Sequence, residues 1–215
     1  MKEDEKVYYR ARMPKILEAL AKKQYDPYFF ETAAEARRFI LDKINTDETV
    51  GIGGSITLRE GLGIVEALRK KGTEVYDHWE AGKDRTRRLE IKRKQRATDV
   101  FLSGLNAITS DGVMVNLDGG GNRVASLCSG PRKVMAVAGT NKIVDSLERA
   151  IHRTRNKTAV VHAIRRNDKT PCVETGICTD CISAERICAA LLILLKKPND
   201  IADFTVILIN EEMGY

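Results

Sequence analysis

Residues 99–139 read DVFLSGLNAITSDGVMVNLDGGGNRVASLCSGPRKVMAVAG. Two short and almost wholly apolar segments, DVFLSG at 99–104 and KVMAVAG at 133–139, enclose a pattern typical of a hairpin that turns at 110–112. Apolar strands of this kind are typical of parallel sheets with both faces buried. We therefore predict two buried strands, with the hairpin as an added antiparallel piece.

The sequence on either side continues this alternation of strands and helices. Further short strands are expected at TVGIGGS (49–55), EVYD (74–77) and FTVILIN (204–210). Helices are expected over residues 3–23, 32–44, 56–69, 82–97, 141–151 and 183–196. Helices between buried strands predict an α/β domain with a mostly parallel sheet flanked by helices, whose ligands bind at the carboxyl ends of the strands.

Local signals set the expected ends of three helices. Thr32 with Glu35, and Thr57 with Glu60, have the spacing of capping boxes. Pro14 is expected to break the first helix, because proline removes a backbone donor and crowds the preceding turn.

The composition excludes several classes of protein. The chain has 215 residues, 43% of them hydrophobic, and its 36 Lys and Arg against 30 Asp and Glu leave a formal charge of +6. This is too apolar for a disordered chain, and no apolar run approaches the ~18 residues of a membrane span. The start, MKEDEKVYYR, lacks the apolar core of a secretory signal, so we expect a cytoplasmic protein. We expect one domain over 1–215, with an N-terminal helical segment at 1–30 and a cysteine-rich segment at 171–188.

The first glycine cluster, GIGGSIT at 51–57, follows a predicted strand and precedes a predicted helix. Backbone N–H groups at such a helix start, with the hydroxyls of Ser55 and Thr57, favour an anion site; the alternative is a tight turn without a ligand. The spacing fits neither the dinucleotide fingerprint nor the P-loop. Asp77 ends the next strand where a ribose-binding acid would lie, so a nucleotide ligand stays open.

The second cluster, DGGGNR at 118–123, contains three consecutive glycines. Because glycine loses the most backbone freedom on folding, such a run favours close approach of a ligand, with Arg123 available to pair with a carboxylate or phosphate. A flexible loop tip is the alternative. Asn106, Thr109 and Asp111 supply further polar groups, or act only as turn formers.

No sequence motif identifies a catalytic group. The candidates for acid–base chemistry are Glu60, Asp111, Asp118 and His78. Lys142, which follows the predicted strand at 133–139, is interpreted as a solvated lysine in the first turn of a helix, with a position in the crevice as the alternative.

Four of the five cysteines lie in PCVETGICTDCISAERIC at 171–188, spaced C-x5-C-x2-C-x6-C. The C-x2-C pair, Cys178 and Cys181, suits metal binding from a single turn. With Cys172 and Cys188 it provides the four thiolates of a zinc site or an iron–sulfur cluster. Two other interpretations stay open: reduced cysteines packed as small apolar residues, and a redox-active dithiol.

Residues 82–97 hold eight Lys and Arg against two acids. Such a helix is a candidate surface for nucleic acid or another anionic partner. No aromatic residues are interleaved with the charges for base stacking, so we interpret it as a solvated basic face and do not expect a nucleic-acid partner.

Three stretches resemble the LUD domain family, also called DUF162, which includes lactate-utilisation protein C and YkgG-like proteins. They are VGIGGSITLREGL at 50–62, DVFLSGLNAITSDGVMVNLDGGGNRVA at 99–125 and GPRKVMAVAGTNKIV at 130–144. The chain is similar to the small stand-alone branch of that family, which carries a cysteine-containing C-terminal segment.

The resemblance implies a fold, a role and a site. The fold would be like those of ribose-phosphate isomerase (RpiA), glucosamine-phosphate deaminase (NagB), CoA transferase and 5-formyltetrahydrofolate cyclo-ligase. The role would be in lactate oxidation beside iron–sulfur redox partner proteins. The implied ligand-binding residues are Gly53, Gly54, Ser55, Thr57, Asn106, Thr109, Asp111, Gly112, Asn116, Gly120, Asn122 and Arg123.

Two hypotheses of different class follow. The first is a LUD-domain protein of lactate or related organic-acid utilisation that binds a small anionic metabolite in the glycine-loop crevice, with an iron–sulfur cluster or zinc as the candidate cofactor. The second is an isomerase- or transferase-type enzyme acting on a phosphorylated or CoA-linked metabolite, which requires two acidic groups to converge near Ser55. A homo-oligomer is compatible with either hypothesis.

Overall fold

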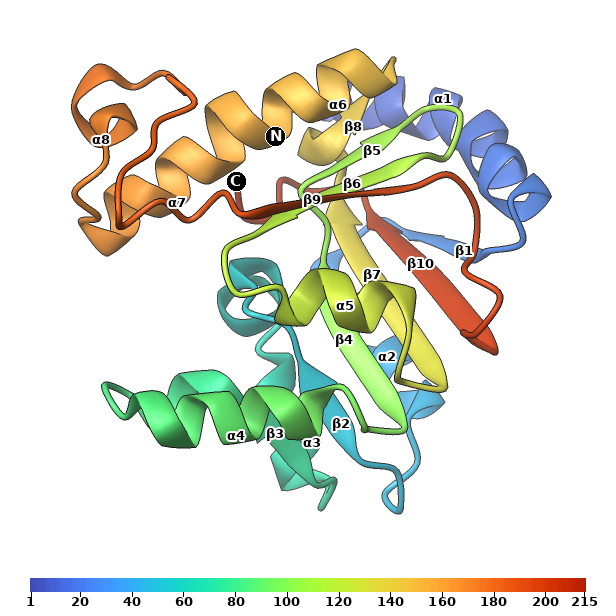
Figure 1. Cartoon of the computed structure of the whole chain (residues 1–215). Helices are drawn as coiled ribbons and strands as arrows, with labels where there is room; N and C mark the ends of the chain where they lie inside the picture. The colour runs from blue at the N-terminus through green and yellow to red at the C-terminus, as the bar shows by residue number, and fades with distance from the viewer.

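The computed structural model describes every residue from 1 to 215. Six parallel strands form the main sheet, in the order β1-β10-β7-β4-β2-β3 (Figure 1). These strands are β1 Asp26–Phe30, β2 Val50–Ile52, β3 Val75–Asp77, β4 Val100–Gly104, β7 Lys133–Gly139 and β10 Asp203–Ile209. The predicted α/β architecture, with a mostly parallel sheet flanked by helices, is confirmed.

A second sheet of four strands, in the order β8-β5-β6-β9, lies beyond the carboxyl ends of β4 and β7. Its strands are β5 Ala107–Thr109, β6 Met114–Asp118, β8 Ile143–Val144 and β9 Ala190–Leu194. β5 and β6 form the predicted antiparallel hairpin, with its turn at residues 110–112. The hairpin is therefore the centre of a separate sheet rather than an addition to the main one.

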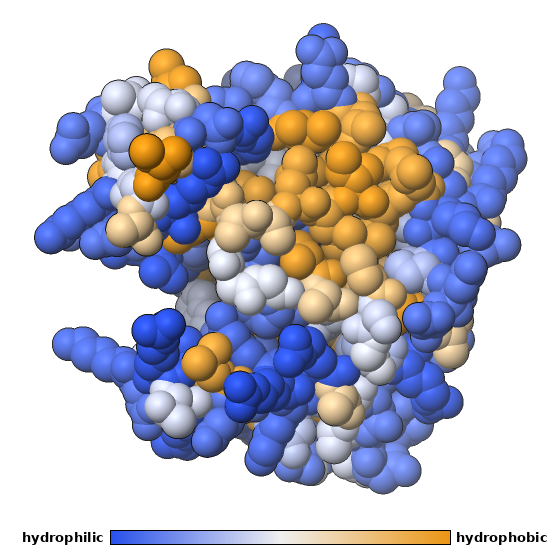
Figure 2. Space-filling model, in the orientation of Figure 1, coloured by the Kyte–Doolittle hydropathy of each residue, from blue (hydrophilic) through white to orange (hydrophobic).

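The predicted helix over 183–196 is wrong, because residues 190–194 form β9. This strand pairs antiparallel with β6, from Met114 opposite Leu194 to Asp118 opposite Ala190. A short apolar run such as ALLIL fits a buried helix or a strand equally well, and the free edge of β6 decides between them. Leu191 is 42% exposed on this edge strand, and Figure 2 shows an apolar patch over the second sheet.

Eight α-helices and four single-turn helices connect the strands. The α-helices are α1 Glu3–Lys22, α2 Ala33–Lys43, α3 Ile64–Lys70, α4 Arg85–Gln95, α5 Asn122–Cys128, α6 Leu147–Arg153, α7 Ala159–Arg166 and α8 Pro171–Thr175. The single turns are η1 Thr57–Gly61, η2 His78–Ala81, η3 Thr140–Lys142 and η4 Thr154–Thr158. None of these helices combines the length and the apolar character that a membrane crossing requires.

Two clusters of buried apolar side chains pack on the two faces of the main sheet. On one face, Ile16 and Leu20 of α1 join Leu127 of α5. On the other, Ile40 of α2 and Leu68 of α3 cover the strands. These clusters leave the carboxyl ends of the central strands free for polar residues.

Helix ends differ from prediction at three places. α1 continues through Pro14 without a break, because its buried face packs on both sides of that residue. The predicted helix over 56–69 is divided: Gly63 has φ +56° and separates η1 from α3. The predicted helix from 141 starts only at Leu147, where the Ser146 side chain accepts from the N–H of Arg149.

One of the two predicted capping boxes is confirmed. Thr32 caps α2 by accepting from the N–H of Glu35, whose carboxylate accepts from the N–H of Thr32. The second is wrong, since Ser55 Oγ accepts from the N–H of Leu58 and the Thr57 hydroxyl donates to a carbonyl near the C-terminus. The Ser55 and Thr57 hydroxyls therefore form hydrogen bonds within the protein, but Thr57 does not cap a helix as the pattern predicts.

Candidate functional site

A large cleft lies at the carboxyl ends of β2, β3 and β4, with α4 along one wall and α7 along the other (Figures 1 and 2). Its volume is about 1010 Å³, at the upper end of the range for small-molecule sites. Figure 2 shows it as a hollow whose rim is hydrophilic. This is the edge of a parallel sheet at which ligands are expected.

The structure brings nine of the residues singled out from the sequence into this cleft. They are Gly54, Ser55, Thr57, His78, Asn106, Asp118, Gly120, Asn122 and Arg123. Six others do not line it: Gly53, Glu60, Thr109, Asp111, Gly112 and Asn116. Only one of the three acidic candidates, Asp118, is in the cleft, so the pair of acids that the enzyme hypothesis requires near Ser55 is not present.

The residues outside the cleft support the hairpin and the loops. The Thr109 hydroxyl donates to the Asp111 carboxylate in the hairpin turn, and Asn116 Oδ1 accepts from the N–H of Asn106 at 3.2 Å. Gly112 has φ +86° and lies against the backbone of α1. In this arrangement the hairpin polar groups act as turn formers, the alternative that the sequence left open.

The first glycine loop packs tightly against its neighbours. A Cβ on Gly104 would lie 2.5 Å from Ser55 Oγ, and a Cβ on Gly54 would lie 3.1 Å from Trp79 Nε1 and 3.4 Å from the His78 ring. Only glycine allows these approaches without displacing a neighbour. The loop therefore places Gly54, Ser55 and His78 on one continuous section of the cleft floor.

Asp118 organises the second glycine loop. Its carboxylate accepts from the N–H groups of Gly120 at 3.2 Å, Arg123 at 2.8 Å and Val124 at 3.4 Å, at the start of α5. Burial alone would raise the pKa of Asp118, but the charge of Arg123 and these three donors hold the pKa below its usual value. The Asp118 carboxylate is therefore ionised, and its hydrogen bonds stabilise the conformation of the second glycine loop.

Asn106 and Arg123 connect this loop to the hairpin. Asn106 Oδ1 accepts from the N–H of Leu117 at 2.8 Å and from Arg123 Nη2 at 3.0 Å. The Asn106 carbonyl accepts from Arg153 Nη1 at 2.6 Å. The sequence predicted that Arg123 pairs with a ligand. In the structure its Nη2 already donates to Asn106 and to the Leu117 carbonyl, so only part of the guanidinium is available to a ligand.

Lys142 lines the cleft, which is the alternative that the sequence left open beside the preferred interpretation as a solvated lysine. It is 4% exposed and donates to Thr57 Oγ1 at 3.0 Å. No carboxylate lies within ion-pair distance. Burial, with smaller contributions from Arg153 and Arg123, lowers the pKa of Lys142 to about 7. The usable signal was its position directly after a buried strand.

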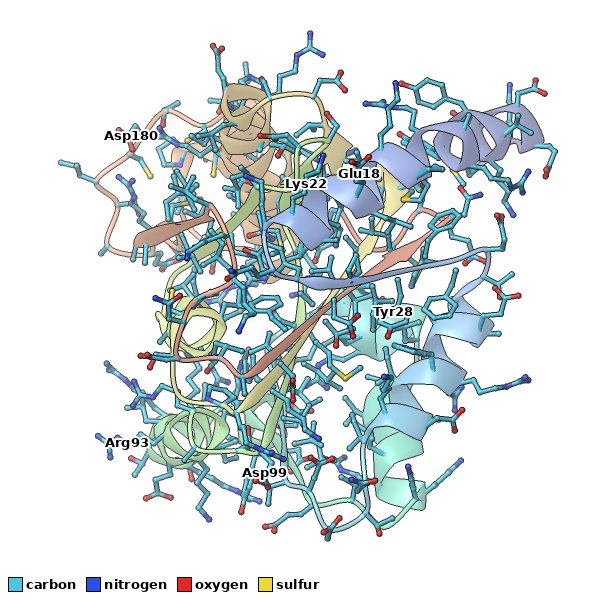
Figure 3. All side chains as sticks on the ribbon, turned by 90° about the vertical axis from the view of Figure 1, so that its right-hand side faces the viewer. Glu18, Lys22, Tyr28, Arg93, Asp99 and Asp180 are labelled. Carbon is cyan, nitrogen blue, oxygen red and sulfur yellow. The ribbon has the colours of Figure 1, made fainter.

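One side of the helix predicted over 82–97 faces the cleft rather than the outer surface of the protein. Arg85, Arg88 and Lys92 line the cleft, at the helical spacing that places them on one face of α4. Arg93 is exposed and outside the cleft, as Figure 3 shows at the surface of the same helix. The 3.6-residue periodicity of these charges was the signal that could have identified the inner face.

Trp79 forms an aromatic wall of the cleft. The Arg59 guanidinium lies 4.1 Å from its ring centroid and that of Arg165 lies 5.3 Å away. Asp77, which the sequence left open as a ribose-binding acid, is 2% exposed, pairs with Arg59 and accepts from the N–H of Trp79. Asp77 is therefore engaged in holding this wall.

Two histidines, His78 and His162, lie in the cleft walls. Burial lowers the pKa of each from 6.5 to about 4, with neighbouring cations adding to the effect. Both rings are therefore neutral at pH 7 and act only as neutral hydrogen-bonding groups or as bases.

The buried histidines predict a loss of stability in mild acid. As pH falls from about 6.5 to about 4, the unfolded chain binds a proton at His78 while the folded chain does not, so the free energy of unfolding decreases. The shift corresponds to about 3 kcal/mol at most for His78. Urea unfolding from pH 7 to pH 4 measures this slope. His78→Gln should reduce the slope to the part that His162 contributes, and the matched change at exposed His152 should leave it unchanged; equal slopes in both variants would contradict the prediction.

The four cysteines of segment 171–188 come together around a second, small cavity. Cys172, Cys178, Cys181 and Cys188 all line it. All are free thiols, and no group of three or more His, Cys, Asp or Glu is arranged to hold a single metal ion. The predicted helix after Cys181 is absent, so these thiols lie on α8 and on an irregular loop.

Comparison with known proteins identifies the family. The model of the LUD domain matches residues 13–209. A solved DUF162 family protein from Deinococcus radiodurans is 14% identical, with a TM-score of 0.52 over 94% of this chain and 98% of that one. Ribose 5 phosphate isomerase A from Neisseria gonorrhoeae aligns over 52% of each chain at 17% identity and a TM-score of 0.32, too distant a likeness to carry an argument. No curated protein matches the sequence. The family match extends over most of the chain, and the chain belongs to the LUD domain family.

Proposed function

We propose that this LUD-domain protein binds a small, multiply anionic metabolite in the cleft, in the service of lactate or related organic-acid utilisation. The family supports the metabolic setting. The observation that carries the proposal is the charge of the cleft: eight Lys and Arg line it against three Asp and Glu. Such an excess of one sign concentrates anions and strengthens their binding.

Most of these cations have no internal carboxylate partner. Of the eight, only Arg166 and Arg186 form salt bridges, and each of the three acids already accepts hydrogen bonds from the protein. Arg88 Nε is buried without an acceptor. Because Lys142 is buried without an acidic partner and the other cations gather around the same cleft, a bound anion that neutralises them would stabilise the folded chain.

The size of the cleft favours a phosphorylated or CoA-linked ligand as the second candidate. A cavity of about 1010 Å³ exceeds the volume of lactate many times over, and its cations are spread over both walls and the floor. The Trp79 ring offers a flat surface for a base or another planar group. These features support a larger polyanion as the ligand.

Thermal shift with single compounds tests the proposal. Lactate, pyruvate, ribose 5-phosphate, ATP and coenzyme A are added separately at two salt concentrations. A ligand of the native state raises the melting temperature, and added salt reduces the shift when charge dominates. The largest shift is expected with a phosphorylated compound. If none of the five stabilises the protein at low salt, the anion site is ruled out.

A matched pair of variants on α4 locates the binding surface. Arg88→Gln removes a cleft cation, and Arg93→Gln removes the same charge from the exposed face of the same helix. A lost charge-assisted contact costs roughly 1.5–3 kcal/mol, so Arg88→Gln should weaken binding ~10-fold or more. Arg93→Gln should stay within about two-fold. Titration calorimetry with the best ligand measures both, and equal losses would place the ligand outside the cleft.

A further inference from the structure

We infer that the four thiols of segment 171–188 bind an iron–sulfur cluster that borders the anion cleft. The inference does not depend on which ligand the cleft binds. It rests on the convergence of Cys172, Cys178, Cys181 and Cys188 on one cavity, although they are spread over 17 residues of largely irregular chain.

The surroundings of the cavity suit thiolate ligands. Arg155 Nη2 lies 3.6 Å from Cys178 Sγ, and the Thr170 hydroxyl lies 3.3 Å from Cys172 Sγ. Arg186 donates to the carbonyls of Cys181 at 2.6 Å and Cys188 at 2.9 Å. The guanidinium groups of Arg155 and Arg186 line the cavity and share the Asp180 carboxylate, so one net positive charge remains beside the thiols. That charge would offset part of the negative charge that thiolates bring to a metal centre.

The spacing of the thiols favours a cluster over a single zinc ion. Zinc holds four sulfurs about 2.3 Å from one centre, which brings them into mutual contact. No three metal-binding side chains of the chain meet that condition. In a [4Fe–4S] cluster each thiolate binds a different iron, so the four sulfurs surround a shared space instead of meeting at one centre. Four thiols that line one cavity without forming a single-ion set suit such a cluster better than a single zinc ion.

The centre would share a wall with the cleft. Ala159, Arg186 and Ile187 line both cavities. Arg186 also pairs with Asp180 in the loop that carries two of the cysteines. A cluster at this position would order the loop and fix the orientation of one cleft arginine, because folding and metal binding are coupled in such segments.

Anaerobic purification of the whole chain tests the inference. Iron, acid-labile sulfide and zinc are measured and the visible spectrum is recorded, before and after reconstitution with ferrous iron and sulfide. About four iron and four sulfide per chain, with a brown colour, is the expected result for four cysteine ligands. One zinc without iron, or no metal even after reconstitution, would overturn the cluster.

Matched variants assign the ligands. Cys178→Ser should lose most of the iron and the visible absorbance, whereas Cys128→Ser, which changes the one cysteine outside the cavity, should retain both. Circular dichroism checks that each variant is folded. Should Cys178→Ser fail to fold, electron paramagnetic resonance of the reduced wild-type protein decides: a cluster signal supports the inference, and its absence refutes it. Equal iron in both variants would also refute it.

Discussion

Replacement of Asp118 by alanine is expected to destabilise the folded chain by about 3–5 kcal/mol, because it leaves three backbone N–H groups without their acceptor and removes the negative charge that faces the Arg123 guanidinium. The carboxylate accepts from the N–H groups of Gly120, Arg123 and Val124, and its charge interacts with that of the Arg123 side chain. Loss of the acceptor removes the link between the glycine run and α5. Urea unfolding followed by circular dichroism measures the change.

Asp118→Asn is the control for the charge. It keeps an acceptor oxygen of similar shape but loses the negative charge, so we expect an intermediate loss of stability. If the alanine variant unfolds within about 1 kcal/mol of the wild type, the scaffold role is refuted, and Asp118 returns to the set of candidate acids in the cleft.

Replacement of Lys142 by methionine is expected to stabilise the protein and to weaken anion binding at the same time. The ammonium group is buried with only the Thr57 hydroxyl as a partner, so an apolar side chain of similar length removes an unpaired buried charge. Below pH 7 the free energy of unfolding is expected to increase by a few kcal/mol. This is on the order of the cost of burying the charged lysine, which the lowered pKa of Lys142 reflects. Residues that cost stability at a binding site commonly serve that site.

The pH dependence of the Lys142 effect has a definite sign. The folded pKa is about 7 and the ordinary value is 10.5. Below about pH 7 the lysine is charged in both states and the folded chain carries the full cost of the buried charge. Between these values only the unfolded chain binds the proton, so wild-type stability rises with pH and the advantage of Lys142→Met disappears toward pH 10.5.

Anion binding should show the opposite trend. As pH rises through about 7, the wild-type cleft loses the Lys142 charge and its affinity for anions falls, whereas Lys142→Met should bind weakly without this step. Unfolding and calorimetry from about pH 6 to pH 10 measure both properties. Lys92→Met serves as the control, since Lys92 also lines the cleft but is less buried. A Lys142→Met protein less stable than the wild type at pH 6 would contradict the argument.

Much of the main sheet could be predicted from the sequence. Five of its six strands fall on apolar runs bounded by glycine or polar turns, and the hairpin follows from the spacing around residues 110–112. The errors have two causes. β9 and the uninterrupted α1 depend on contacts with distant segments, which local propensity does not contain. The helix expected over 56–69 is divided at Gly63, whose left-handed conformation the helical pattern does not reveal.

For the candidate site, too, some features follow from the sequence and others only from the fold. The glycine loops and the cysteine spacing are local patterns, and the sequence by itself determined that they exist and which chemistry they suit. Only the tertiary structure decided that Arg88, Lys142 and Arg165, from three elements far apart in the chain, meet in one cleft, and that Asp118 serves the loop. The reason is physical: the energy of a charge depends on its burial and neighbours, and both are set when the chain folds, so a lysine that reads as solvated becomes the buried cation of the site.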